Sequence, residues 1–104
     1  MNIYFINGWG NYSHSYNWDD GLTIGQAEIW PQDKIRAWDK YITDNPSQGN
    51  YIPSEEDDEG VYILQLHEHG GSRNVLVCVI AETPQEAEEM AQEWAEAYYP
   101  SINC

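Results

Sequence analysis

Apolar and polar residues alternate most clearly in the second half of the chain. Residues 61–67 and 74–81 are rich in β-branched and aliphatic side chains, which predicts two strands. Gly70 and Gly71 lie between them, and glycine supplies the positive φ angles of a two-residue turn. We therefore expect a hairpin with both glycines at its tip and both in the positive-φ region.

A two-residue loop also fixes which residues face one another across this hairpin. It places Glu68 opposite Arg73, which predicts a cross-strand ion pair. One face is expected to hold Tyr62, Leu64, Leu66, Val75, Val77 and Val79. The other is expected to hold Val61, Ile63, Leu76, Cys78 and Ile80 near the base, and Gln65, His67, His69, Ser72 and Asn74 near the tip.

The residues after the hairpin predict a helix that ends before Pro100. Thr83 is a favourable N-cap, Pro84 suits the first helical position, and Glu86 completes a capping box. Apolar side chains then recur at helical spacing: Ala87, Met90, Ala91, Trp94, Ala95 and Tyr98. This stripe is expected to pack on the sheet.

The first half of the chain has a weaker pattern. Residues 2–7 predict a strand, and 8–21, rich in Gly, Asn, Ser, Tyr and Trp, predict a long aromatic loop or a loose hairpin. Residues 23–30 fit either a strand or the start of a short helix. Residues 31–44 predict a helix, and 45–60 a loop. That helix should face inward with Ile35, Trp38, Tyr41 and Ile42, and outward with Lys34, Arg36 and Lys40.

Together these elements predict a single α+β domain over residues 1–104. It should contain an antiparallel sheet of three to four strands, a C-terminal helix packed on one face, and a second helix near the middle of the chain. The hairpin and the Glu-Thr-Pro-Gln-Glu-Ala helix start, over residues 61–98, are similar to the ends of small phage-encoded and bacterial accessory proteins. That resemblance implies a fold and no particular activity.

The net charge is a stronger indication of function than any motif in the chain. Eighteen Asp and Glu stand against four Lys and Arg, a formal net charge of −14. Residues 1–52 hold six acids and three bases, whereas residues 53–104 hold twelve acids and only Arg73. Self-repulsion of this size opposes compaction, so the charge serves either solubility or the binding of something basic.

The predicted C-terminal helix concentrates this charge. Glu86, Glu89, Glu93 and Glu96 step by three and four residues, which places them on one face opposite the apolar stripe. No Lys or Arg separates them, so each neighbouring pair costs about 0.2–0.5 kcal/mol. The row is about 15 Å long. It is sparser than duplex phosphate, which carries one charge per ~1.7 Å of axis.

A second acidic row could come from one run: Glu55, Glu56, Asp57, Asp58 and Glu59. This run is not expected to be a calcium loop, because the twelfth position falls on Leu66 where a bidentate Glu is required. Non-specific cation binding or a second partner-binding row remain as its two interpretations.

Metal, cofactor and catalytic sites are not expected. His67 and His69 share one strand face, but two ligands do not make a metal site, and His14 lies in the aromatic segment. Cys78 should be an inert thiol inside a strand, and it is not expected to be joined to Cys104. Neither Ser13-His14-Ser15 nor Gly8-Trp9-Gly10 has the context of a catalytic or dinucleotide-binding motif.

The first half of the chain also contains a cluster of aromatic residues. Trp9, Tyr12, Tyr16 and Trp18 are either core or a binding surface. Direct nucleic-acid binding is not expected, because the negative field repels phosphate. The first residues lack the basic flank of a signal peptide, and no apolar run reaches membrane-spanning length, so a cytoplasmic protein without membrane contact is expected.

In size, charge and acidic rows the chain resembles the DNA-mimic class, such as the anti-restriction and anti-CRISPR proteins of phages and mobile elements. This resemblance implies a non-enzymatic inhibitor that presents carboxylates in place of phosphates to a basic nucleic-acid-binding protein. The expected partner-binding residues are Glu86, Glu89, Glu93, Glu96 and the run Glu55–Glu59. The alternative is an interaction module, antitoxin-like or an accessory subunit, whose acidity serves solubility.

Overall fold

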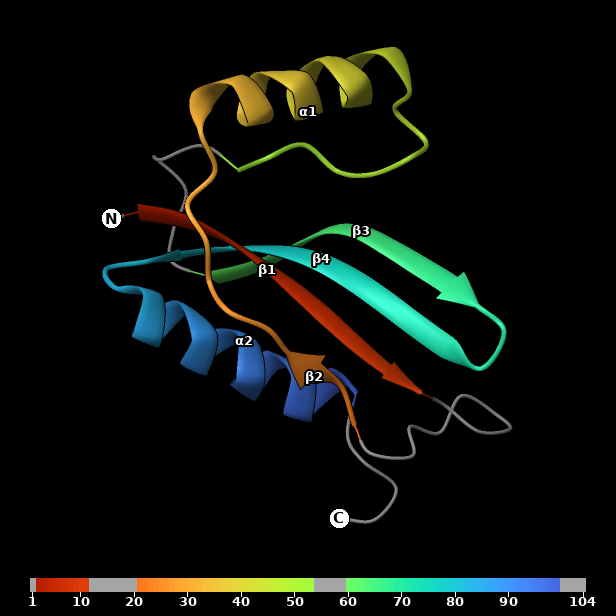
Figure 1. Cartoon of the computed structure of the whole chain (residues 1–104), viewed down its shortest axis with the longest axis vertical. Coiled ribbons are helices and arrows are strands. Elements are labelled where there is room, and N and C mark those ends of the chain that lie inside the picture. Colours follow the sequence, from red (N-terminus) through yellow and green to blue (C-terminus); the bar gives the residue numbers. More distant parts are fainter. Residues whose placement is uncertain (1, 12–20, 54–59, 100–104) are drawn as a thin grey trace.

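The computed structural model describes residues 2–11, 21–53 and 60–99, except for the side chain of residue 69. The element order is β1 (Asn2–Asn11), β2 (Thr23–Ile24), α1 (Gln32–Asp44), β3 (Gly60–His69), β4 (Ser72–Ala81) and α2 (Pro84–Tyr98). The four strands form one antiparallel sheet in the order β2-β1-β4-β3. Figure 1 shows α1 on one face of this sheet and α2 on the other. The predicted α+β architecture is confirmed.

Alternation along the central strands divides the buried residues between the two faces. On β1, Tyr4 and Ile6 point toward α2, whereas Phe5 between them points toward α1. The α2-side core contains Tyr4, Ile6, Leu22, Val75, Val77, Val79, Ala81, Ala87, Ala91 and Ala95. The smaller α1-side core contains Phe5, Trp30, Leu64 and Cys78. The sheet is therefore covered on both faces.

The helix α2 begins and packs largely as its sequence predicts. The Oγ1 atom of Thr83 accepts a hydrogen bond from the N–H of Glu86 at 3.2 Å. The Glu86 carboxylate, however, accepts from the N–H of Glu82 at 3.3 Å, one residue before the position that a capping box uses. Ala87, Ala91 and Ala95 are fully buried against the sheet. Their short side chains allow α2 to approach the strands closely.

The helix α1 lies farther from the sheet than α2 does. No Cα atom of α1 lies within 8 Å of a Cα atom in any strand or in α2. The space is filled by large rings: Trp30 stacks on Phe5 with centroids 3.9 Å apart, and Trp38 meets Trp30 edge-on at 6.3 Å. Ile42 is fully buried, whereas Tyr41, which was expected to face inward, is 43% exposed.

Residues 49–53, here called the strap, run between α1 and the sheet (Figure 1). Asn50 binds the edge strand β3 twice, through its N–H to the Leu64 carbonyl at 2.9 Å and its Nδ2 to the Ile63 carbonyl at 2.7 Å. Its own carbonyl accepts from Trp38 Nε1 at 3.0 Å. The strap thus links α1 to β3.

The hairpin of β3 and β4 is confirmed, but its base has a different register from the expected one. Glu68 pairs with Arg73 as expected, and their side chains form an ion pair. A bulge at Leu64 then shifts the pairing, so that Tyr62 lies opposite Cys78 and Val61 opposite Val79. The expected faces are therefore wrong at the base. Tyr62 and Leu64 pack on the α1 side, and Val61 and Ile63 pack on the α2 side.

Two further expectations need correction, and one pair of alternatives is decided. Only Gly70 of the turn has a positive φ, +62°, which suits a turn that needs this geometry at its first central position. The strand β1 continues to Asn11 and pairs with β2, so the described part of residues 8–21 fits the loose hairpin and not the long loop. The strand expected over 23–30 is reduced to Thr23–Ile24 and a single bridge between Glu28 and Phe5.

Candidate acidic face and aromatic groove

The candidate functional surface is the solvent-facing side of α2. Glu86, Glu89, Glu93 and Glu96 are all exposed, and this set is called the glutamate row. The buried alanines of the same helix hold the row in place, because they fix the rotation of α2 against the sheet. The four predicted residues therefore form one exposed face of a helix that is packed on the sheet.

The four carboxylates differ in their local partners. Glu86 accepts from the N–H of Glu82, and Glu96 accepts from Gln92 Nε2 at 3.3 Å. Glu89 and Glu93 make no hydrogen bond or ion pair with any residue that the structure describes. These two carboxylates in the middle of the row are the ones most available to a partner.

None of the four bases of the chain belongs to the helix that carries this row. Residues 84–98 of α2 contain five Glu and no Lys or Arg. Lys34, Arg36 and Lys40 lie on α1, across the sheet, where three Asp balance them. The fourth base of the chain, Arg73, is paired with Glu68 at the hairpin. The helix that carries the glutamate row thus supplies no neutralising base of its own.

Glu88 is the one glutamate of α2 that lies outside the row. It is half-buried, and its Oε1 accepts a hydrogen bond from the backbone N–H of Ala27 at 3.1 Å. A hollow of about 500 Å³ beside it is lined by residues 24–26 and by the side of α2. Glu88 therefore anchors residues 25–28 to α2.

The second acidic run cannot be placed beside the glutamate row. Glu55, Glu56, Asp57, Asp58 and Glu59 lie outside the described residues, as do His14, Tyr12, Tyr16, Trp18 and Cys104. The idea that the run adds a second row of charges therefore remains a prediction.

The residues considered for metal or redox chemistry are separate from the glutamate row. Within the described ranges no three His, Cys, Asp or Glu side chains come together as metal ligands. His67 is exposed, and its Nε2 lies 3.2 Å from Gln65 Nε2. Cys78 is a fully buried free thiol, and burial raises its pKa to about 12. A thiol in this state is a poor nucleophile.

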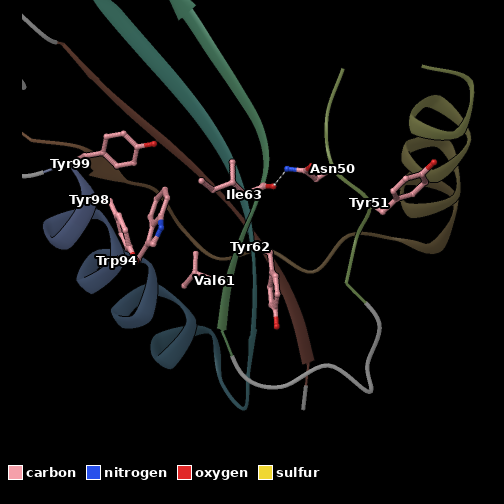
Figure 2. A pocket seen from close by; sticks show the side chains of 8 residues that line it. All are labelled: Asn50, Tyr51, Val61, Tyr62, Ile63, Trp94, Tyr98 and Tyr99. Carbon is pink, nitrogen blue, oxygen red and sulfur yellow. Dashed lines mark hydrogen bonds between the residues drawn. The ribbon is translucent and has the colours of Figure 1, made fainter. Parts of the chain in front are cut away.

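Sequence reasoning missed a groove at the edge of the sheet, beside the C-terminal end of α2. Its volume is about 520 Å³, and it is called the aromatic groove. It is lined by Asn50, Tyr51, Val61, Tyr62, Ile63, Trp94, Tyr98 and Tyr99 (Figure 2). None of these residues is charged.

One signal for this groove was present in the apolar stripe of α2. The stripe continues to Tyr98, yet that side chain is 71% exposed and does not cover the core. Trp94 packs near both tyrosines, with ring centroids 6.3 Å from Tyr98 and 5.4 Å from Tyr99. Large aromatic side chains that a helix leaves exposed at its end are typical of binding surfaces.

Comparisons of the chain with protein-family models, with curated proteins and with solved structures give no match. In the described part of the chain no helix is long and apolar enough to cross a membrane.

Proposed function

We propose that this protein is a small acidic inhibitor that binds a basic nucleic-acid-binding protein, with the glutamate row in place of backbone phosphates. The observation that carries the proposal is the separation of charge between the two helical layers. The layer of α2 has five Glu and no base, whereas α1 has three acids and three bases.

This separation is costly if charge serves only solubility. The like charges of the row repel one another along the helix, and Glu93 and Glu96 lie toward the negative end of the helix dipole. A solubilising helix gains stability when Lys or Arg is interspersed, as happens on α1. A basic surface on a partner would offset this repulsion when it binds, because its cationic groups would neutralise the carboxylates of the row.

The mechanism is competitive exclusion. The net charge of −14 attracts a basic protein over a distance that depends on the salt concentration. This screening distance, the Debye length, is about 8 Å at physiological ionic strength. At contact, the carboxylates of Glu89 and Glu93 accept hydrogen bonds from Lys and Arg side chains that otherwise bind phosphate. Nucleic acid is then excluded because both ligands need the same cationic groups. No step in this mechanism is catalytic.

The test is a pull-down from host lysate followed by binding measurements on the captured protein. Glu89→Lys combined with Glu93→Lys should weaken binding at least tenfold, or by about 1.4 kcal/mol. Wild-type binding should also fall steeply between 50 and 200 mM salt, and duplex DNA should compete with it.

The matched control is Asp39→Lys combined with Asp44→Lys, which makes the same change in net charge on exposed positions of α1. If both double variants bind equally well or equally poorly, the row itself is not the binding surface. If the captured protein is neutral or acidic, and binding is insensitive to salt, the chain is an interaction module whose acidity serves solubility.

A further inference from the structure

The aromatic groove presents ring faces to solvent. Tyr98 is 71% exposed and Tyr51 is 58% exposed, at two ends of the same groove (Figure 2). An aromatic face attracts a cation through its quadrupole, and Arg stacks on such faces especially well. The chain already contains one such contact, since Lys34 Nζ lies 4.2 Å from the centroid of the Trp30 ring.

The floor of the groove is the edge strand β3. The Ile63 carbonyl points away from β4, because it accepts a hydrogen bond from Asn50 Nδ2 of the strap. Backbone groups alternate with a period of two along a strand, so the N–H and C=O of Val61 also point outward. No described residue forms a hydrogen bond with these two groups of Val61. An extended peptide can therefore add to the sheet at this position.

Charge selects among extended peptides. Among the described residues no charged side chain lines the groove, and Glu93 of the glutamate row directly precedes Trp94 in the chain. The bases that could compete for the aromatic rings lie on α1 or are paired at the hairpin. The negative charge of the protein and the exposed aromatic rings both favour arginine, and the outward-pointing backbone groups of Val61 favour an extended segment. The ligand that fits all three features is an extended segment that carries arginine.

We propose that the aromatic groove binds an extended, arginine-bearing segment of a protein partner. The backbone of that segment pairs with Val61, and a guanidinium stacks against Trp94 and Tyr98. The inference rests on the proposed function only in assigning this segment to the same basic partner. The groove then supplies a second contact beside the glutamate row.

The experiment uses a capped pentapeptide, Val-Arg-Val-Arg-Val, and a neutral control in which Gln replaces both Arg. Titration of the full chain is followed by NMR at 50 mM salt. The Arg peptide should bind at least about fivefold more tightly than the Gln peptide. It should also shift the indole signal of Trp94 and slow hydrogen exchange at the Val61 amide.

Substitutions at Tyr98 separate ring stacking from simple apolar contact. Tyr98→Phe keeps the ring and should bind the Arg peptide within about twofold of wild type, whereas Tyr98→Leu should lose about threefold or more. Tyr41→Leu, at an exposed tyrosine on α1, is the control and should change nothing. If Phe and Leu at position 98 bind equally, stacking does not occur.

The remaining outcomes distinguish this inference from the proposed function. If Glu89→Lys with Glu93→Lys abolishes partner binding while Tyr98→Leu leaves it unchanged, the row acts alone and the groove inference is wrong. If the Arg peptide binds but reversal of the row has no effect on the partner, the groove stands and the proposed function fails. If sedimentation shows a dimer that Tyr98→Leu dissociates, a second copy occupies the groove and the inference is overturned.

Discussion

The carboxylate of Glu88 accepts a hydrogen bond from the backbone N–H of Ala27 at 3.1 Å, which ties α2 to the segment beside β1. Glu88 and Glu89 are adjacent in sequence but have opposite roles, because Glu88 is half-buried and bonded whereas Glu89 is exposed. The acidity of α2 is thus divided between one structural carboxylate and four that face solvent.

Replacement of Glu88 should therefore cost stability. We expect Glu88→Ala to lower the free energy of unfolding by about 1 kcal/mol relative to Glu89→Ala, because it leaves the Ala27 N–H without its acceptor. Both variants remove one like charge from the helix, so their difference isolates the hydrogen bond. Urea unfolding measures it. Equal stabilities would show that the bond contributes nothing.

Gly49 should tolerate no side chain. A Cβ atom there would lie 2.8 Å from the Leu64 carbonyl oxygen and 3.0 Å from the Ile42 side chain. We expect Gly49→Ala to lower the free energy of unfolding by about 1–3 kcal/mol, because the strap must shift away from β3.

Gly60→Ala is the matched control for this change. A Cβ atom at position 60 would lie 3.6 Å from the Tyr62 ring, which is an ordinary van der Waals distance. Thermal unfolding of both variants should show a lower midpoint for the position 49 variant. A midpoint at or above that of Gly60→Ala would contradict the tight packing of the strap.

Cys78 should couple stability to alkaline pH. Burial raises its pKa from an ordinary 9.0 to about 12, so the folded protein keeps the proton that the unfolded chain releases above pH 9. The contribution of Cys78 is complete below pH 9 and is lost as the pH rises from 9 toward 12. Wild type should therefore lose more stability than Cys78→Ala between pH 8 and 11. Parallel curves, measured by urea unfolding, would refute the coupling.

The turn at Gly70 supplies another test. Its φ is +62° and a Cβ would meet no atom within 4 Å, so backbone strain alone opposes a side chain. Gly70→Ala should cost about 1 kcal/mol of unfolding free energy, and Gly70→Asn less, because Asn tolerates this conformation better. Denaturant unfolding of the two variants should preserve this order.

Local signals predicted the elements better than the contacts between them. The Gly-Gly turn and the Glu68–Arg73 pair fixed the tip of the hairpin, and both occur in the structure. The bulge at Leu64 could not be predicted, because it is supported by Asn50, a residue of the strap outside the hairpin. Residues 8–11 have the composition of a loop but form strand, because β4 supplies their hydrogen-bonding partners.

The same distinction applies to the candidate site. Helical periodicity alone predicted the glutamate row, since its members share one face of one helix. The aromatic groove combines side chains from the strap, β3 and α2, and only the tertiary fold brings these three elements together. The exposure of Tyr98 is likewise set by where α2 passes the sheet edge.

The separation of α1 from the sheet has a consequence for how the molecule opens. Elements held mainly by side chains and by their connecting segments undergo sub-global unfolding more readily than elements in a continuous ladder. The amides of α1 and the strap should therefore exchange with deuterium before those of β1, β4 and α2. A form in which only α1 and the strap have opened would then keep the glutamate row intact, so it could still bind a partner through that row.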